Sequence, residues 1–182
     1  MQETVLIKPP SRPGHPVERF VLPGGEAVTI RPIRPEDAGI EQDFVRHLSP
    51  GARYFRFMQV LDELSPEMLD RFIHLDYDRE YALIAVVEQD GREVEIGVAR
   101  YAALDADRCE FAVVVADAWQ RQGIGRRLME RLMEIARDHG FRQMIGLILA
   151  ENQPMLGLAE RLGFRIEPVP DDLTVKRAVR DL

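Results

Sequence analysis

Cysteine is nearly absent from this chain, since Cys109 is the only one among 182 residues. An intrachain disulfide and a multi-cysteine metal site are therefore both excluded. The histidines show no ligand spacing such as His-x-x-x-His, so we expect no metal. Long apolar runs are missing as well: no segment is long enough to span a bilayer, and the N-terminus lacks a signal core. These absences favour a cytoplasmic protein with no membrane contact.

Positive charge is scarce. The chain has 24 lysines and arginines against 31 acidic residues, a formal net charge of -7. Non-specific nucleic-acid binding requires a basic face that displaces counterions, so we expect no nucleic-acid partner. A local site for a small anion remains compatible with this charge, because a helix N-terminus acts at short range. The 46% hydrophobic and 30% charged fractions are typical of a globular protein.

The sequence predicts one α+β domain over residues 19–182, preceded by a flexible arm over residues 1–18. The arm carries four prolines and a glycine, which disfavour a helix or a central strand: Pro9, Pro10, Pro13, Gly14 and Pro16. We expect the arm to be dispensable. No repeat and no linker divides the rest of the chain.

Apolar periodicity and turn residues predict the elements of the domain. Strands are expected at residues 19–22, 27–31, 81–88, 94–103, 108–115 and 144–149, and from 164 onward. Helices are expected at residues 35–48, through 54–57, and at 65–75, 123–140 and 154–162.

The segment of residues 113–128, Val-Val-Val-Ala-Asp-Ala-Trp-Gln-Arg-Gln-Gly-Ile-Gly-Arg-Arg-Leu, indicates a phosphate site. Gly123 and Gly125 stand where a long helix begins, so the backbone can approach a ligand closely. The first helical N–H groups have no partner within the helix. Arg126 and Arg127 add charge at the rim. A tight strand-to-helix turn would use the same glycines.

Two common phosphate loops do not fit this segment. A dinucleotide fingerprint requires a third glycine where Leu128 stands, and a P-loop requires a lysine that is not nearby. Gln120, Gly123 and Gly125 instead match Gln/Arg-x-x-Gly-x-Gly/Ala of the general-control-related N-acetyltransferase (GNAT) superfamily. Residues 152–164, Asn-Gln-Pro-Met-Leu-Gly-Leu-Ala-Glu-Arg-Leu-Gly-Phe, resemble the second conserved block of that family.

The resemblance covers roughly residue 28 to the C-terminus and implies the GNAT fold, of mixed α/β class. Its central, mostly antiparallel sheet would be splayed between the fourth and fifth strands of the family, with helices on both faces. Acetyl-CoA would be the co-substrate. The resemblance assigns cofactor contacts to the loop and to the flanking strand and helix: Val113, Val115, Gln120, Arg121, Gln122, Gly123, Ile124, Gly125, Arg126 and Asn152. Asn152 also suits an N-cap, because Pro154 follows it.

Three further segments resemble the bacterial protein lysine acetyltransferases that modify acyl-CoA synthetases. They are residues 31–38, Arg-Pro-Ile-Arg-Pro-Glu-Asp-Ala, residues 54–58, Tyr-Phe-Arg-Phe-Met, and residues 76–83, Asp-Tyr-Asp-Arg-Glu-Tyr-Ala-Leu. This implies acetyl transfer to a protein lysine by direct attack in a ternary complex. Transfer to a small amine or amino acid, and a catalytically inactive acyl-CoA-sensing module, remain alternatives. Those relatives often carry a fused regulatory domain, for which this chain has no room, and an oligomer is possible.

Glu110 is the candidate general base. Neutralising a lysine amine of pKa about 10.4 at pH 7 costs about 4.6 kcal/mol, and a carboxylate offsets part of that cost. In the resemblance Glu110 lies on the fourth strand, where alternation sets it on one face with Ala112 and Val114. Apolar neighbours would raise the pKa of Glu110 by desolvating its carboxylate. The alternative is that Glu110 is an exposed surface glutamate. Ala159 stands where many relatives carry a tyrosine acid, and Asp76 is the next candidate base.

Overall fold

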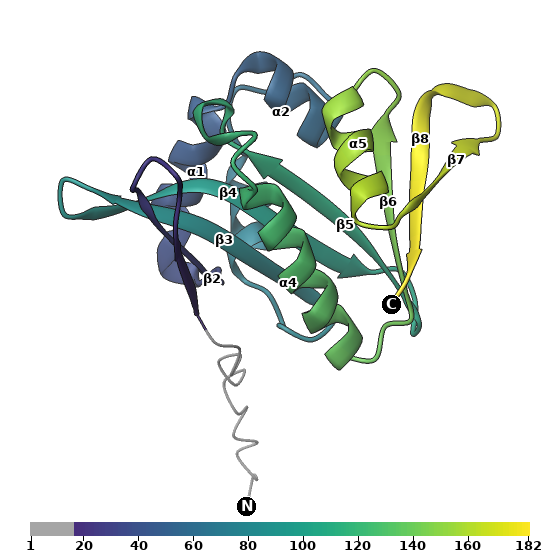
Figure 1. Cartoon of the computed structure of the whole chain (residues 1–182), viewed down its shortest axis with the longest axis horizontal. Helices are drawn as coiled ribbons and strands as arrows, with labels where there is room; N and C mark the ends of the chain where they lie inside the picture. Colours follow the sequence, from purple (N-terminus) through teal and green to yellow (C-terminus); the bar gives the residue numbers. More distant parts are fainter. Residues whose placement is uncertain (1–16) are drawn as a thin grey trace, which may run out of the picture.

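One eight-stranded sheet organises residues 17–182, the part of the chain that this computed structural model describes (Figure 1). Its strands are β1 (Glu18–Val21), β2 (Ala27–Pro32), β3 (Glu80–Gln89), β4 (Arg92–Ala103), β5 (Arg108–Val115), β6 (Gln143–Leu149), β7 (Arg165–Val169) and β8 (Asp172–Asp181). They lie in the order β1-β2-β3-β4-β5-β6-β8-β7. Every neighbouring pair is antiparallel except β5 and β6, which are parallel.

Helices cover both faces of this sheet (Figure 1). On one face lie α1 (Ala38–His47), α2 (Pro50–Phe57) and α3 (Pro66–Ile73), and on the other lie α4 (Ile124–Asp138) and α5 (Gln153–Arg161). Two short 3-10 turns, η1 (Pro35–Asp37) and η2 (Asp117–Trp119), precede α1 and α4. The predicted mixed α/β class, the mostly antiparallel sheet and the helices on both faces are confirmed.

The two faces of the sheet carry separate cores, and β3 serves both. Its side chains alternate, as a strand requires, so that odd positions face α4 and even positions face the layer of α1 and α3. The first set is Tyr81, Leu83, Ala85 and Val87, and the second is Ala82, Ile84 and Val86. Burial on both sides explains why this strand is apolar from Tyr81 to Val87, which is typical of a strand covered on two faces.

The predicted arm lies mostly outside the described residues, which begin at Val17. Glu18, assigned to the arm from the sequence, instead opens β1 and pairs with Ile30. Its carboxylate also accepts a hydrogen bond from Arg127 at 2.8 Å. The boundary of the domain therefore falls at least one residue earlier than the sequence predicts.

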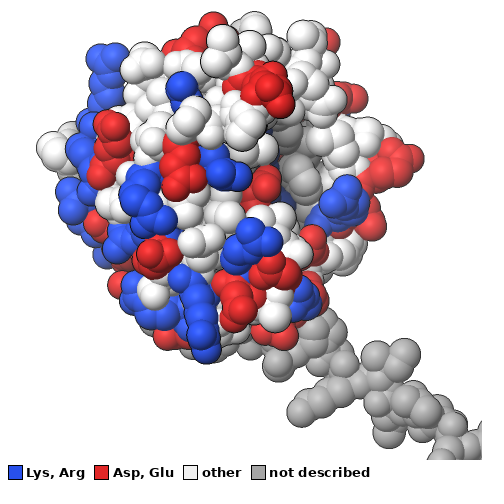
Figure 2. Space-filling view, turned by 90° about the vertical axis from the view of Figure 1, so that its right-hand side faces the viewer, with Lys and Arg blue, Asp and Glu red and all other residues white. Residues whose placement is uncertain are grey.

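Charged side chains lie along the edge that β7 and β8 form. Figure 2 shows this side of the molecule, where basic and acidic side chains are interspersed. The carboxylate oxygens of Glu167 on β7 lie 3.3 Å from a guanidinium nitrogen of Arg177 on β8 and 3.9 Å from one of Arg165. Because β7 is the last strand of the sheet, charges there disfavour pairing of its open edge with another chain.

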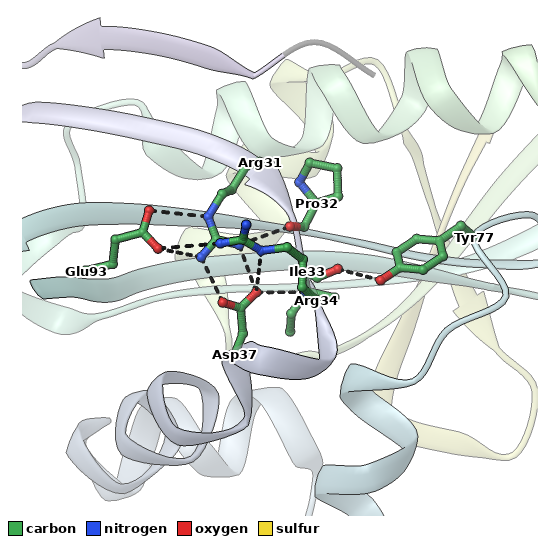
Figure 3. Close-up of polar contacts among 7 residues, drawn as sticks. All are labelled: Arg31, Pro32, Ile33, Arg34, Asp37, Tyr77 and Glu93. Carbon is green, nitrogen blue, oxygen red and sulfur yellow. Dashed lines mark hydrogen bonds and ion pairs between the residues drawn. The ribbon is translucent and has the colours of Figure 1, made fainter. Parts of the chain in front are cut away.

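A buried guanidinium joins three elements near the start of the domain (Figure 3). Arg31 on β2 is 6% exposed, and its two terminal nitrogens each donate to one oxygen of Asp37 at 2.8 Å. The same guanidinium donates to Glu93 on β4 at 2.6 Å. Asp37, itself 4% exposed, immediately precedes α1 and also accepts from the Arg34 amide at 2.7 Å. This cluster of Arg31, Asp37 and Glu93 holds the start of α1 next to β2 and β4.

Burial alone would lower the pKa of Arg31, but the hydrogen bonds and charges of Asp37 and Glu93 outweigh it and raise that pKa. Arg31 is therefore charged in the interior and depends on its partners. The Arg-Pro-Ile-Arg-Pro-Glu-Asp segment that resembles the lysine acetyltransferases has, in this structure, a clear architectural role.

Asp37→Ala should lower the free energy of unfolding by about 3 kcal/mol, because it leaves a buried guanidinium with only a half-exposed partner. Urea denaturation followed by circular dichroism measures the change. Glu93→Gln is the matched control: that carboxylate is 45% exposed, so its removal should cost less than about 1 kcal/mol. Equal losses from the two variants would contradict this account.

Candidate active site

The strands β5 and β6 part after a short parallel ladder. Only three residue pairs join them, the last being Glu110 with Ile145. Beyond that point β5 continues to pair with β4 as far as Val115, while β6 pairs with β8 along its whole length. The predicted split in the sheet is therefore confirmed. It lies between the fifth and sixth strands of this chain, because β1 adds a strand before the family's set.

An aromatic ring lies where the two strands separate. The next pair in register would be Phe111 with Gly146, and a Cβ built on Gly146 would lie 2.4 Å from the Phe111 ring. That ring also packs against Phe164, with centroids 5.0 Å apart. The absence of a side chain at Gly146 thus makes room for Phe111 at the root of the split.

A cleft of about 570 Å³ follows the split. Nine of the ten residues predicted to contact the cofactor line it: Val113, Val115, Gln120, Arg121, Gly123, Ile124, Gly125, Arg126 and Asn152. Gln122 is the exception, because it is not among the residues that line the cleft. Residues far apart in the sequence, from α2, β5, the loop and α5, meet around this one space.

The N-terminus of α4 opens onto the cleft without a cap. Gly123 precedes the helix with φ of +84°, a left-handed conformation that favours glycine. The Arg127 amide is the first to donate back along the helix, to the Gly123 carbonyl at 3.1 Å. The amides of residues 124–126 come before that bond, and the first turn holds no acidic side chain. Free amides and the helix dipole together make a site for an anion.

The two arginines of the rim behave differently. Arg126 lines the cleft, with its guanidinium 2.8 Å from Glu130 one turn further along α4. Arg127, predicted to stand beside it, points to the β1 hairpin instead, where it pairs with Glu18 and stacks over Phe20 at 4.3 Å. That part of the prediction is wrong, because the partners of Arg127 are far away in the sequence.

Side chains within the loop hold its shape. The side-chain amide of Gln120 donates a hydrogen bond to the Val115 carbonyl at 3.0 Å. Val115 was expected to contact the cofactor, but its carbonyl oxygen already has a partner within the protein. Asp117 accepts from the amide and hydroxyl of Ser49 at 3.1 and 2.8 Å. Ser49 in turn caps α2 through the Ala52 amide. Sequence reasoning missed this link between the loop and α2, although Ser49-Pro50 is typical of a helix start.

Asn152 caps α5, as one of its two interpretations predicts. Its side-chain oxygen accepts from the Met155 amide at 3.3 Å, while the residue also lines the cleft. Ala159, two turns along the same helix, is fully buried in the core. No proton donor stands at that position.

Glu110 lies beside the cleft rather than in it. It lines a second cavity of about 290 Å³, which shares Arg56, Phe111 and Ala112 with the cleft. The alternation of β5 is as predicted, with Phe111 packed in the core under α4 and Glu110 on the other face. Of the two surroundings that the sequence left open for Glu110, the structure has the exposed one and not the apolar one that would raise its pKa. Alternation assigns a face, but only the packed structure decides whether a helix covers it.

Asp76, the second candidate base, lines neither of these two cavities. Its carboxylate accepts from the backbone amides of residues 78, 79 and 80 at 2.9 Å. Partial burial would raise the pKa of Asp76, but these amides lower it further than burial raises it. Asp76 therefore stabilises a turn and is a weak base.

A split sheet beside an uncapped, glycine-led helix defines a class of acyl-group transferases. The chain belongs to the acetyltransferase (GNAT) family, whose model matches residues 47–164. It is 42% identical over 154 residues to "Acetyltransferase PA5475" of Pseudomonas aeruginosa, covering 84% of this chain and 83% of that protein. This protein is accordingly an N-acetyltransferase.

Solved structures agree on the fold. The GNAT domain of S. lividans PAT superposes with a TM-score of 0.83 at 28% identity, covering 94% of this chain and 99% of that one. A putative acetyltransferase from Salmonella typhimurium, yncA, was solved with its cofactor acetyl-CoA. It superposes with a TM-score of 0.63 at 21% identity, covering 85% of this chain and 92% of that one. Within residues 17–182, no helix has the length and apolar character to cross a membrane, and no cluster of three potential metal ligands occurs.

Gly146→Ala should destabilise the protein by about 1–3 kcal/mol, because its methyl group would overlap the Phe111 ring at the root of the split. Thermal and urea unfolding measure the loss. The double variant with Phe111→Leu supplies the test of cause: the smaller side chain should make the added methyl much less costly. If the two losses simply add, the contact does not limit this position.

Proposed function

We propose that this enzyme transfers the acetyl group of acetyl-CoA to the side-chain amine of a protein lysine, by direct attack in a ternary complex. The observation that carries the proposal is the cleft between β5 and β6, with the open N-terminus of α4 at one end and Glu110 beside the other. The N-terminus of α4 suits a phosphate-bearing substrate, and the carboxylate of Glu110 suits an amine.

The chain's own groups fit acetyl-CoA. In the proposal, the amides of residues 124–126 bind its pyrophosphate, with Arg126 adding charge at the rim. The cleft-side edge of β5 beyond Glu110 lacks a ladder with β6 and offers main-chain groups to the amides of the pantetheine arm. The amide of Val113 is our candidate to polarise the thioester carbonyl.

Glu110 is proposed to take the proton of the attacking amine. Its carboxylate makes no hydrogen bond or ion pair with another described residue, so it is free to accept. It stands at the last pair before the strands diverge, next to the space where amine and thioester would meet. Exposure at this point also suits an acceptor that arrives on another protein.

Two candidates for the acceptor have support. The proposal of a protein lysine, with an acyl-CoA synthetase as its bearer, follows from the three sequence segments and from the match to the S. lividans PAT domain over nearly all of both chains. An L-amino acid is the second candidate. A 55-residue stretch is 42% identical to "L-amino acid N-acyltransferase MnaT" of Escherichia coli, although it covers only 30% of this chain.

Gly125→Asp should weaken acetyl-CoA binding more than about tenfold, because it introduces a like charge where the phosphates would bind. Isothermal titration calorimetry measures the affinity. Gly125→Ala is the matched control: a Cβ there would lie 3.5 Å from Leu158 and Val115, an ordinary contact, so the fold accepts it. The alanine variant should bind more tightly than the aspartate variant, and unchanged affinity in both would sink the phosphate assignment.

Glu110→Gln should reduce turnover by about 10²–10⁴-fold while the Kd for acetyl-CoA stays within about twofold, since it removes the base and keeps the shape. The variant should recover rate as pH rises toward the lysine pKa of about 10.4, where more of the amine is already neutral. Thiol release with a lysine peptide, followed against pH, measures both effects.

Glu88→Gln, an exposed glutamate at the far end of β3, is the control and should behave as wild type. A pH profile of Glu110→Gln parallel to that of wild type, together with weaker acetyl-CoA binding, would show that Glu110 is structural.

A further inference from the structure

The second cavity, beside the cleft, is rich in arginine. Arg56, Arg71 and Arg100 line it together with Glu80, Glu110 and the rings of Phe72 and Phe111. Arginine side chains are unexpected around a site that is to receive a positively charged amine, because like charges repel. Arg71 is exposed to water, whereas the less exposed Arg56 and Arg100 differ in what neutralises them, and that difference indicates a ligand.

Arg100 already has an anionic partner in the protein. It donates to the Glu41 carboxylate at 3.0 Å and to the Phe72 carbonyl at 3.3 Å, and it lies 4.0 Å above the Phe72 ring. Its side chain is 12% exposed and that of Glu41 only 2%. Burial, and then Glu41, raise the pKa of the neighbouring Glu95 well above its usual value. One buried cation is thus matched by one buried anion.

Arg56 has no such partner. Its guanidinium stacks on Phe57 at 4.7 Å and near Phe72 at 5.8 Å, yet it makes no hydrogen bond or ion pair with any residue from 17 to 182. The residue is half-buried, and it lines both the cleft and the second cavity. Burial, and then Arg100, lower the pKa of Arg56 below the usual value. The five N–H donors of this guanidinium lack protein acceptors in a site that is only partly open to water, which costs free energy until an anion binds.

We propose that the second cavity holds the acceptor, and that Arg56 selects acceptors that carry a carboxylate close to the reacting amine. The inference rests on the proposed function, since Glu110 in the same cavity would receive the amine proton. Arg56 and Glu110 then bind the two ends of a zwitterionic group, the guanidinium taking the carboxylate through a forked pair of hydrogen bonds. That carboxylate belongs either to a free amino acid or to an acidic residue beside the target lysine.

Paired acceptors test the proposal in the full-length enzyme. One pair is L-leucine and L-leucinamide, and the other is two end-blocked lysine peptides with glutamate or glutamine next to the lysine. Thiol release gives kcat and KM for each, and the quantity of interest is the acid-to-amide ratio of kcat/KM. Differences in amine basicity cancel when this ratio is compared between wild type and a variant.

Arg56→Gln should lower the ratio by about tenfold or more in one of the pairs, mainly through KM, since a charge-assisted hydrogen bond is lost. The pair that responds identifies the source of the carboxylate. Arg56→Lys keeps a positive charge and should restore part of the ratio. Arg92→Gln, which removes an exposed arginine at the opposite end of β4, should leave both ratios unchanged.

Three outcomes would overturn the assignment of Arg56: ratios that do not change in Arg56→Gln, ratios that fall equally in Arg92→Gln, or a loss of acetyl-CoA affinity that accounts for the whole effect. If wild type binds acetyl-CoA but acetylates none of the four acceptors, the proposed function fails instead. Calorimetric titration of L-leucine, L-leucinamide and the two peptides into the CoA-bound protein then decides the inference. Acid-selective binding that Arg56→Gln abolishes supports it, and equal binding of acid and amide refutes it.

Discussion

The divergence of β5 and β6 is the constraint on which the rest of this structure depends. A continuous parallel ladder would satisfy the main chain of both strands and leave no cleft, but the ladder ends after three pairs. Each strand keeps its other neighbour, so the sheet remains one body while a gap opens within it. Phe111 over Gly146 occupies the root of that gap. The gap places unpaired strand edges, the N-terminus of α4 and the cap of α5 around one space.

Buried arginines have opposite roles in two parts of the molecule. The Arg31 guanidinium is bound by two carboxylates and joins β2, β4 and the start of α1, so its charge contributes to the architecture. Arg100 is likewise matched by Glu41. Arg56, where the two cavities meet, makes no hydrogen bond or ion pair with any residue from 17 to 182. A buried charge that the fold neutralises stabilises the fold, whereas one that it leaves unmatched is available to a ligand.

Much of the site was predictable because its signals are local. Gly123 must adopt a left-handed backbone, and the helix that follows it starts with open amides whatever surrounds it. Alternation likewise assigned Glu110 to the face opposite Phe111. The exposure of Glu110, the turn of Arg127 toward Glu18 and the link from Asp117 to Ser49 were not predictable. Each depends on a partner, or on the lack of one, that the chain brings into place only on folding.

The sequence alone determined the family, the order of helices and strands, and the loop that begins α4, because these follow from short-range periodicity, turn chemistry and a motif of adjacent residues. Tertiary structure alone decided which charges are matched and that Arg56 from α2 stands between the two cavities. The physical reason is that burial and charge pairing are properties of surroundings, and here the surroundings of each residue come from elements distant in the chain.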